Sequence, residues 1–465
     1  MTRTMWIEEG TVGRNHIAMS FGVDDLRFST MYWYEDVDFH VLAERYGAAL
    51  LRSVVFHAVA FEANKLTSLR PDVVDFGPYR DMVSAPFWEL WTTVWQNVWG
   101  QWRFENDLPD YHGPALAHDL APAADLAVSI DGVHAAPLAF VGGGKDSLIA
   151  MSLLDEAGYD YDTYGYSHSV YGTAAFQHEL LDRLTRHGMR AKQHRRHWVF
   201  DDFLDSPVVS LRADLGVRTL TAAETPSSLF GAIPVVLAHG YGTLVLAHER
   251  SADHGNLTWE ATGESINHQW GKSIEAERLL QSYVRAQLVG NLTYTSVLKP
   301  IYDPVIFAAL RHRGLAVRDT HSCNVRKPWC EECSKCAYVW INYQAFVDEE
   351  VLAGMFRTNL ADTPVNQLWF RQMLGLEEHT PFECVGQVPE AMLAFELASA
   401  RGLAGDAVNT YHERCGPLSP QAVGDLFAVA GDHHTMTPEM AARLVPVLER
   451  WADEGRAYAE GLLDR

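Results

Sequence analysis

The hydrophobic pattern changes abruptly within residues 136–157. Residues 138–141 form a short apolar run that ends in three consecutive glycines, which is typical of a buried parallel strand. After Gly144 the apolar side chains recur at the spacing of one helix face. They are Ala150, Leu153, Leu154 and Ala157. The pattern therefore predicts a strand, a glycine loop and a helix in direct succession.

Residues 1–130 are predicted to form an α+β region that is rich in aromatic side chains. The stretch 26–33 has the β-branched and aromatic composition of a strand, and 42–66 has the few breakers of a helix. Ser84 is expected to cap a further helix, with Pro86 tolerated in its first turn. Five tryptophans follow at helical spacing, which indicates core or a domain interface, with a wall that stacks on a base or sugar as the alternative. They are Trp88, Trp91, Trp95, Trp99 and Trp102.

Residues 131–340 alternate between strand and helix patterns. The runs 163–167 and 243–247 predict strands, and 174–187 predicts a helix. This alternation favours a doubly wound parallel sheet, in which ligands bind at the C-terminal ends of the strands. Residues 341–465 are predicted to form a mostly helical C-terminal region. The predicted fold class is therefore α/β, with an added N-terminal α+β region and a helical C-terminal region.

Two features within the alternating region have open alternatives. Ser227 or Ser228 is a candidate cap for a helix that Pro234 interrupts. The basic run 190–196 faces either an anionic substrate or only water.

The glycine loop has the composition of a phosphate-binding site. Gly142, Gly143 and Gly144 carry no Cβ atoms that would keep an anion away, and glycine permits positive φ. A strand, loop and helix in this order aim backbone N–H groups and the positive end of the helix dipole at an anion. Lys145 adds a charge and Ser147 a hydroxyl donor. A glycine turn without a ligand is the alternative.

The order of residues in this loop resembles that of a known family. In a Walker loop Ser or Thr follows the lysine, whereas here Asp146 follows Lys145. Residues 142–147 are similar to the S-G-G-x-D-S loop of the PP-loop ATP pyrophosphatases, with Gly142 in place of the first serine. The resemblance implies a PP-loop (adenine nucleotide alpha hydrolase-like) fold, ATP binding by this loop, and activation of a carboxylate, amide or carbonyl oxygen as an adenylate.

Four cysteines lie within fourteen residues and predict a metal site. They are Cys323, Cys330, Cys333 and Cys336. Two Cys-x2-Cys steps supply the turn by which four thiolates converge on a tetrahedral Zn²⁺. A structural zinc is predicted, and an iron–sulfur cluster or free thiols are the alternatives. Cys384 and Cys415 stand apart and are interpreted as inert core cysteines, with a reactive thiol as the alternative.

A polar segment follows the predicted strand at 243–247, which places its side chains at the ligand-binding end of the sheet. His248, Glu249 and His254 are candidates for proton transfer on this location. Lys272 is a further candidate catalytic residue because it begins the next predicted helix. Two interpretations of Lys272 and its neighbour Ser273 are open. They bind a phosphate or carboxylate at the N-terminus of this helix, or they are simply the first residues of a helix on the surface.

Composition narrows the classes of function. The 465-residue chain carries 37 Lys and Arg against 60 Asp and Glu, a net charge of −23, which argues against a protein that wraps nucleic acid. The first nine residues lack the apolar core of a signal peptide, and no apolar run reaches the roughly 18 residues of a membrane span. We therefore expect a cytoplasmic protein of two or three domains without membrane or nucleic-acid partners.

The glycine loop and the four cysteines together are similar to the 7-cyano-7-deazaguanine synthases, PP-loop enzymes with a zinc knot. This chain is much longer, and its full layout resembles the UDP-N-acetylmuramoyl-L-alanyl-L-glutamate epimerases of peptidoglycan synthesis. The resemblance implies conversion of the terminal L-Glu of that small-molecule substrate to D-Glu through an acyl-adenylate, with release of AMP and diphosphate. It also implies Mg²⁺ beside ATP.

Two other functions stay open on sequence. One is another carboxylate-adenylating PP-loop enzyme, such as an amide ligase or a nitrile synthase. The other is a nucleotide-binding protein without turnover.

Overall fold

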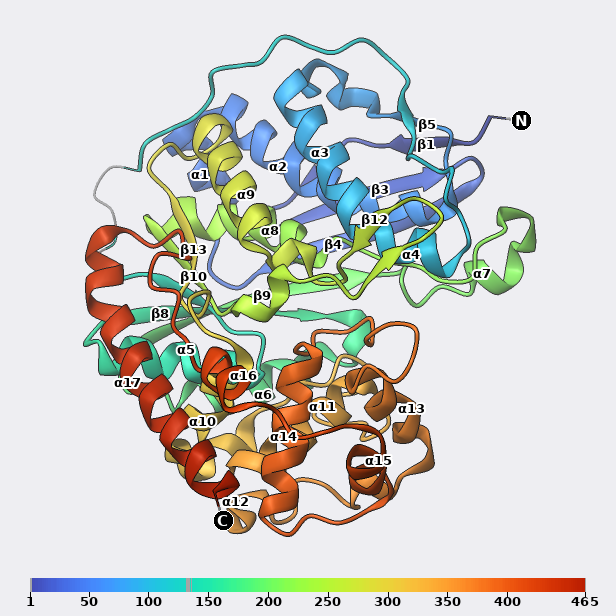
Figure 1. Ribbon diagram of the computed structural model, residues 1–465. Helices are drawn as coiled ribbons and strands as arrows, with labels where there is room; N and C mark the ends of the chain where they lie inside the picture. The colour runs from blue at the N-terminus through green and yellow to red at the C-terminus, as the bar shows by residue number, and fades with distance from the viewer. Residues whose placement is uncertain (1, 131–133, 135, 465) are drawn as a thin grey trace.

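The computed structural model describes residues 2–130, 134 and 136–464. One sheet runs through the middle of the molecule, with one layer of helices above it and a second layer below it in the view of Figure 1. The predicted domain boundary after residue 130 adjoins positions 131–133, which lie outside the described residues. The division into 1–130, 131–340 and 341–465 therefore stays a prediction.

The central sheet has eleven strands in the order β13-β10-β7-β8-β9-β4-β3-β1-β5-β6, with β2 paired to β3. The strands are β1 (Thr4–Ile7), β2 (Thr11–Val12), β3 (His16–Val23), β4 (Leu26–Tyr34), β5 (Val73–Asp75), β6 (Ala115–Leu116), β7 (Leu138–Phe140), β8 (Tyr161–His168), β9 (Ala191–Asp201), β10 (Thr243–Leu246) and β13 (Thr293–Ser296). A separate hairpin joins β11 (Leu257–Trp259) to β12 (Glu264–Ile266).

The sheet is mixed and mostly parallel. The run β13-β10-β7-β8-β9 is parallel throughout. At β9 the direction changes, because β4 pairs antiparallel with it from Thr30↔Asp201 to Tyr34↔His197. The α/β class is thus confirmed, and the strands of the N-terminal region extend the same sheet. The strands predicted at 26–33, 163–167 and 243–247 are confirmed as β4, β8 and β10.

Helices pack on both faces of the sheet (Figure 1). The upper layer in that view contains α1 (Phe39–Tyr46), α2 (Ala48–Ala63), α3 (Ala85–Val98), α4 (Gly100–Glu105), α8 (Glu224–His239) and α9 (Ile274–Gln287). The lower layer contains α5 (Lys145–Glu156), α6 (Ala174–Thr185), α10 (Asp303–Leu310), α11 (Ser334–Phe346), α14 (Val388–Ala400) and α17 (Pro438–Leu463). The remaining α-helices are α7 (Val208–Leu211), α12 (Glu349–Leu352), α13 (Pro364–Met373), α15 (Asp406–Arg414) and α16 (Pro420–Leu426). The predicted helical C-terminal region is confirmed.

The helices of the N-terminal region follow from their local sequence. Gly47 takes a φ of +86°, a conformation that favours glycine, and it divides the predicted helix 42–66 into α1 and α2. Ser84 caps α3 as expected, since its Oγ accepts the Phe87 N–H at 3.4 Å. The tryptophan stripe is core, because four of its members are buried and Trp88 is partly buried against the same cluster. The four are Trp91, Trp95, Trp99 and Trp102.

The expected cap and the expected break of the helix around Pro234 are both wrong. Helix α8 runs uninterrupted through Pro234, and Ser227 and Ser228 lie inside it rather than at its cap. Nearly the whole of this apolar helix is buried, and this burial outweighs the hydrogen bond that proline cannot donate.

The basic run lies along β9, where Arg195 pairs with Asp36 at 2.5 Å and Arg196 with Glu35 at 2.8 Å, so it faces carboxylates.

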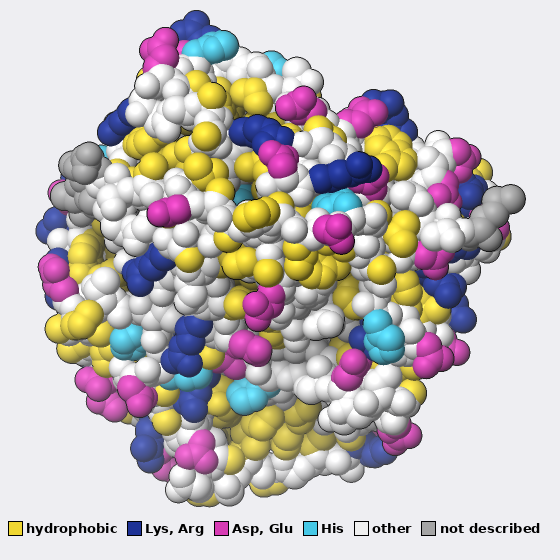
Figure 2. All heavy atoms as spheres, turned by 90° about the horizontal axis from the view of Figure 1, so that it is seen from above, with side chains coloured by type: hydrophobic (Ala, Val, Ile, Leu, Met, Phe, Trp, Pro, Cys, Tyr) yellow, Lys and Arg dark blue, Asp and Glu magenta, His cyan; other side chains and the backbone are white. Residues whose placement is uncertain are grey.

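No helix among the described residues is both long enough and apolar enough to span a membrane. Figure 2 shows Lys and Arg side chains scattered among Asp and Glu on the face seen from above.

Buried His57 makes the fold sensitive to acid. Its Nδ1 donates to the Ser53 carbonyl at 2.7 Å and its Nε2 accepts from the Tyr283 hydroxyl at 2.7 Å, which joins α2 to α9. Burial lowers the pKa of His57 to about 4. Because the unfolded chain takes up this proton near pH 6.5 and the folded chain does not, stability is lost as pH falls below that value.

We expect the protonation of His57 to lower the free energy of unfolding by about 2 kcal/mol between pH 7.5 and pH 5. Urea unfolding of the wild type and of His57→Gln at both pH values measures it. The variant starts less stable at pH 7.5 but loses about 2 kcal/mol less on acidification. Equal losses in the two proteins would contradict the assignment.

Candidate active site

A cavity of about 460 Å³, here called the main cavity, opens at the C-terminal ends of β7 and β10. These strands are parallel neighbours, with Leu138 opposite Leu244, so the segments that follow them emerge at the same edge of the sheet. The glycine loop after β7 and His248 and Glu249 after β10 line this cavity. Two segments that the sequence analysis treated separately therefore share one site.

The glycine loop has the predicted strand–loop–helix geometry. Gly143 takes a φ of +93°, and a Cβ on it would lie 1.9 Å from His321 Nε2. The His321 N–H donates to the Gly143 carbonyl at 2.8 Å, which fixes the two residues against each other. No side chain caps the N-terminus of α5, and the Gly142 N–H donates to Ser147 Oγ at 3.1 Å. Uncapped N–H groups at a helix N-terminus are suited to an anion.

The side chain of Lys145 is turned into the protein. Its Nζ lies 2.5 Å from Asp146 Oδ1 and 2.6 Å from Asp303 Oδ1. Burial lowers the pKa of Lys145, but the two carboxylates raise it by more, so that the ammonium form is held. A direct contact between Lys145 and a phosphate stays a prediction.

Three carboxylates form a candidate site for a hard cation. One oxygen from each of Asp146, Glu249 and Asp303 lies within 4.8 Å of the others. Burial, and then the charges of Asp303 and Asp146, raise the pKa of Glu249. Carboxylate oxygens are ligands that Mg²⁺ prefers, and one ammonium against three carboxylates leaves an excess of negative charge for a cation to offset. The donor set therefore fits Mg²⁺.

The polar segment after β10 divides into residues that face the main cavity and residues that hold the fold. Burial, and then the charges of Lys272 and Lys299, lower the pKa of His248, which keeps it neutral. His254 does not line the main cavity and instead stacks on Tyr302, with ring centroids 6.2 Å apart. Asp253 accepts from the buried Lys299 ammonium at 3.0 Å, which orders the segment.

Lys272 lines the main cavity at the end of a short 3₁₀ helix, Trp270–Lys272. Its Nζ donates to Cys384 Sγ at 2.8 Å, while Ser273 caps α9 by accepting the Ala276 N–H at 3.1 Å. The lysine thus faces the cavity, and the serine completes the helix. Sequence reasoning treated Cys384 as an inert core cysteine, but this thiol lines the main cavity.

Further cavity residues come from the segment that carries the four cysteines. His321, Ser322, Lys327 and Lys335 all line the main cavity, and the sequence analysis assigned none of them a role. Burial lowers the pKa of His321 to about 3, so its imidazole is neutral. The only sequence signal was their position beside Cys323 and between the other cysteines, since a metal knot fixes its neighbours in space.

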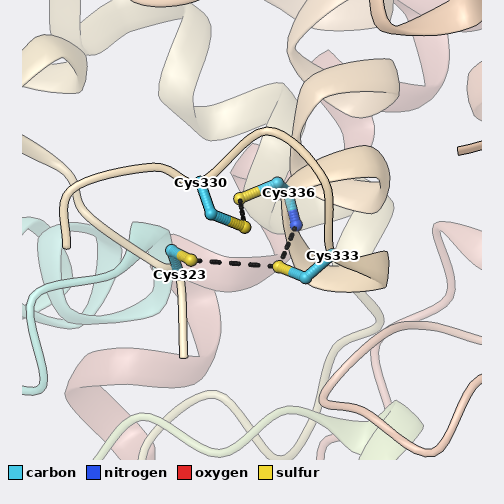
Figure 3. A group of neighbouring side chains, drawn as sticks. All are labelled: Cys323, Cys330, Cys333 and Cys336. Atoms are coloured by element: carbon cyan, nitrogen blue, oxygen red, sulfur yellow. Dashed lines mark hydrogen bonds between the residues drawn. The ribbon is translucent and has the colours of Figure 1, made fainter. Parts of the chain in front are cut away.

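The four predicted cysteines converge, as Figure 3 shows. Cys323 Sγ lies 3.9 Å from Cys333 Sγ, and Cys330 Sγ lies 3.8 Å from Cys336 Sγ. Tetrahedral Zn²⁺ with Zn–S bonds of about 2.3 Å separates its sulfur ligands by about 3.8 Å. Backbone N–H groups also point at the sulfurs, for example from Arg326 to Cys323 at 3.3 Å, as they do around thiolate ligands. The arrangement can hold zinc.

Two domain models of one protein family match parts of this chain. The MurL N-terminal domain matches residues 227–297, and the MurL C-terminal domain matches residues 317–411. Both matches include walls of the main cavity, and the second spans all four cysteines of the knot.

Curated relatives carry one name. A UDP-N-acetyl-alpha-D-muramoyl-L-alanyl-L-glutamate epimerase from a Micromonospora species is 28% identical over 387 residues, which cover 78% of this chain and 80% of the relative. An epimerase of the same name from Salinispora tropica is 28% identical and covers 69% of this chain and 68% of the relative. A third, from Xanthomonas oryzae pv. oryzae, is 28% identical and covers 73% and 74%. The resemblance to the UDP-N-acetylmuramoyl-L-alanyl-L-glutamate epimerases, which the full layout of the chain predicted, is therefore confirmed.

Proposed function

We propose that this protein is an ATP-dependent epimerase with a PP-loop fold. It inverts Cα of the terminal L-Glu of UDP-N-acetylmuramoyl-L-alanyl-L-glutamate through an acyl-adenylate and releases AMP and diphosphate. One observation carries the proposal: a glycine loop with an uncapped helix N-terminus and a set of proton-transfer side chains line the same cavity. The relatives' names support the substrate, and the loop supports ATP.

Adenylation solves the central chemical difficulty of such an inversion. A carboxylate beside Cα makes the Cα proton hard to remove, because the carbanion would form next to a negative charge. Transfer of AMP to that carboxylate removes the charge and gives Cα–H the acidity of an activated ester. A general base then takes the proton, a proton returns on the opposite face, and water hydrolyses the adenylate.

The chain's residues divide the work in this scheme. Gly143, Gly144 and Ser147 hold the diphosphate portion of ATP through backbone N–H groups and a hydroxyl. Asp146, Asp303 and Glu249 would hold Mg²⁺, which offsets the charge of the triphosphate. Three lysines that line the main cavity attract the anionic substrate, namely Lys272, Lys327 and Lys335.

Product analysis tests the proposal. Purified protein is incubated with ATP, Mg²⁺ and the L-Glu-terminated UDP-muramoyl dipeptide, nucleotides are separated by anion exchange, and glutamate chirality is read after hydrolysis. We expect AMP, diphosphate and D-Glu. ADP in place of AMP, or no D-Glu, would refute the epimerase.

Deuterated solvent separates the epimerase from an amide ligase or nitrile synthase. An epimerase incorporates deuterium at Cα and needs only water. A ligase leaves Cα unlabelled and turns over only when ammonia or another nucleophile is added.

A further inference from the structure

The thiol of Cys384 lines the main cavity and is paired with a lysine ammonium. Its Sγ accepts a hydrogen bond from the Lys272 ammonium at 2.8 Å, although the two residues are 112 positions apart in the sequence. Both line the main cavity together with the glycine loop. A cation in contact with a cysteine favours the thiolate, which is the basic form.

This thiol interacts with five titratable groups, namely Lys272, His268, Lys335, Glu383 and Tyr171. Burial raises the pKa of Cys384. Lys272, a hydrogen bond with His268, and Lys335 lower that pKa, whereas Glu383 works in the opposite direction. The pKa of Cys384 is lowered overall from the ordinary thiol value, because the positive groups outweigh burial and Glu383.

Two residues that line the main cavity have buried polar atoms without partners among the described residues. Gln269 is 5% exposed and donates its Nε2 to the Val385 carbonyl at 3.1 Å, while its Oε1 has no hydrogen-bond partner among the described residues. Ser322, which is 7% exposed, likewise leaves its Oγ unpaired within the described part of the chain. Buried polar groups are nearly always paired. Both atoms are therefore exceptions to this rule at the cavity wall.

We propose that Cys384 is the catalytic base that removes the Cα proton of the adenylated glutamyl residue, and that Lys272 is the positioning residue that holds it as a thiolate. This inference rests on the proposed function and adds a named base to it. In this scheme the carboxylates around Asp146 serve the phosphates and their metal and take no part in removing the Cα proton.

The proton transfer balances in two steps. The Cα–H bond breaks and an S–H bond forms on Cys384, while the C–H electron pair moves into the activated carbonyl as an enolate. Water then protonates Cα on the opposite face. The thiol proton neutralises the hydroxide that remains, and Cys384 returns to the thiolate.

Separate readouts of the two half-reactions test this assignment. Cys384→Ser keeps the size of the side chain but offers no anion near neutral pH. We expect it to retain exchange of labelled diphosphate into ATP, which reports adenylation, and to lose deuterium incorporation at Cα by at least about 100-fold. Cys415→Ser is the matched control, because Cys415 lies at the end of α15 outside the main cavity, and it retains both readouts.

Alkylation gives a readout that does not depend on turnover. In the Cys415→Ser background, the rate of iodoacetamide labelling of Cys384 is followed against pH by mass spectrometry. Lys272→Met is expected to move the labelling midpoint to higher pH, and Lys272→Arg to restore most of the shift.

The outcomes separate this inference from the proposed function. A wild type that makes D-Glu, together with a Cys384→Ser variant that exchanges the Cα proton at the wild-type rate, overturns the role of Cys384 alone. An unchanged midpoint in Lys272→Met overturns the role of Lys272. A wild type that releases no AMP refutes the proposed function instead.

Discussion

Gly143→Ala is expected to lose ATP-dependent AMP release by at least about 100-fold. Alanine at this position is opposed twice, by a backbone φ of +93° and by a Cβ that would lie 1.9 Å from His321 Nε2. His321 is buried and its ring Nδ1 donates to the Asp319 carbonyl at 3.1 Å, so the imidazole moves aside only by losing this contact. The N–H groups that the proposed mechanism aims at phosphate would then be displaced. Steady-state AMP and diphosphate release measures the effect.

Gly142→Ala is the matched comparison for stability. A Cβ on Gly142 meets no atom within 4 Å, and its backbone does not need positive φ. We therefore expect Gly142→Ala to unfold at the wild-type urea concentration and Gly143→Ala to lose about 2 kcal/mol or more. Equal stability of the two variants would mean that His321 yields to the new methyl group, and the steric argument would fail.

The parts of the site that the sequence predicted are those built from contiguous residues. The strand, glycine loop and first turn of α5 follow from one switch of hydrophobic period, and the cysteine knot follows from its spacing. Each local pattern is decided by a few neighbouring residues. The same reasoning failed at Pro234, where burial against distant elements outweighs a local helix breaker.

The pairings that define the chemistry could not be predicted in this way. Lys145 meets Asp303 across 158 positions, and neither neighbourhood has a pattern that marks the contact. Cys384 was interpreted as an inert core thiol because the lysine and histidine that alter its pKa belong to another segment. The pairing of β4 with β9, which joins the N-terminal strands to the central sheet, is likewise set by tertiary packing.

Removal of the metal from the four-cysteine site is expected to reduce both stability and substrate affinity. The site is predicted to hold one Zn²⁺ per chain, and metal binding by an otherwise unconnected loop contributes directly to folding. Lys327 and Lys335 lie between or beside the cysteines and line the main cavity, so loss of the knot would also release them. We expect a chelator that strips the metal to weaken ATP binding by about tenfold or more. Urea unfolding and equilibrium nucleotide binding measure the two quantities, and elemental analysis shows that the metal has been removed.

Cys336→Ser and Cys415→Ser separate the knot from general thiol chemistry. Cys336 is fully buried within the knot and its loss leaves three ligands, whereas Cys415 lies outside it. Cys336→Ser should purify with less than one zinc per chain, because three ligands cannot close a structural tetrahedral site. Its free energy of unfolding in urea should fall by several kcal/mol. The second should keep its metal and its affinity for ATP. A visible absorbance near 400 nm with bound iron would instead identify an iron–sulfur cluster, and a metal-free wild type with full ATP affinity would remove the knot from the site altogether.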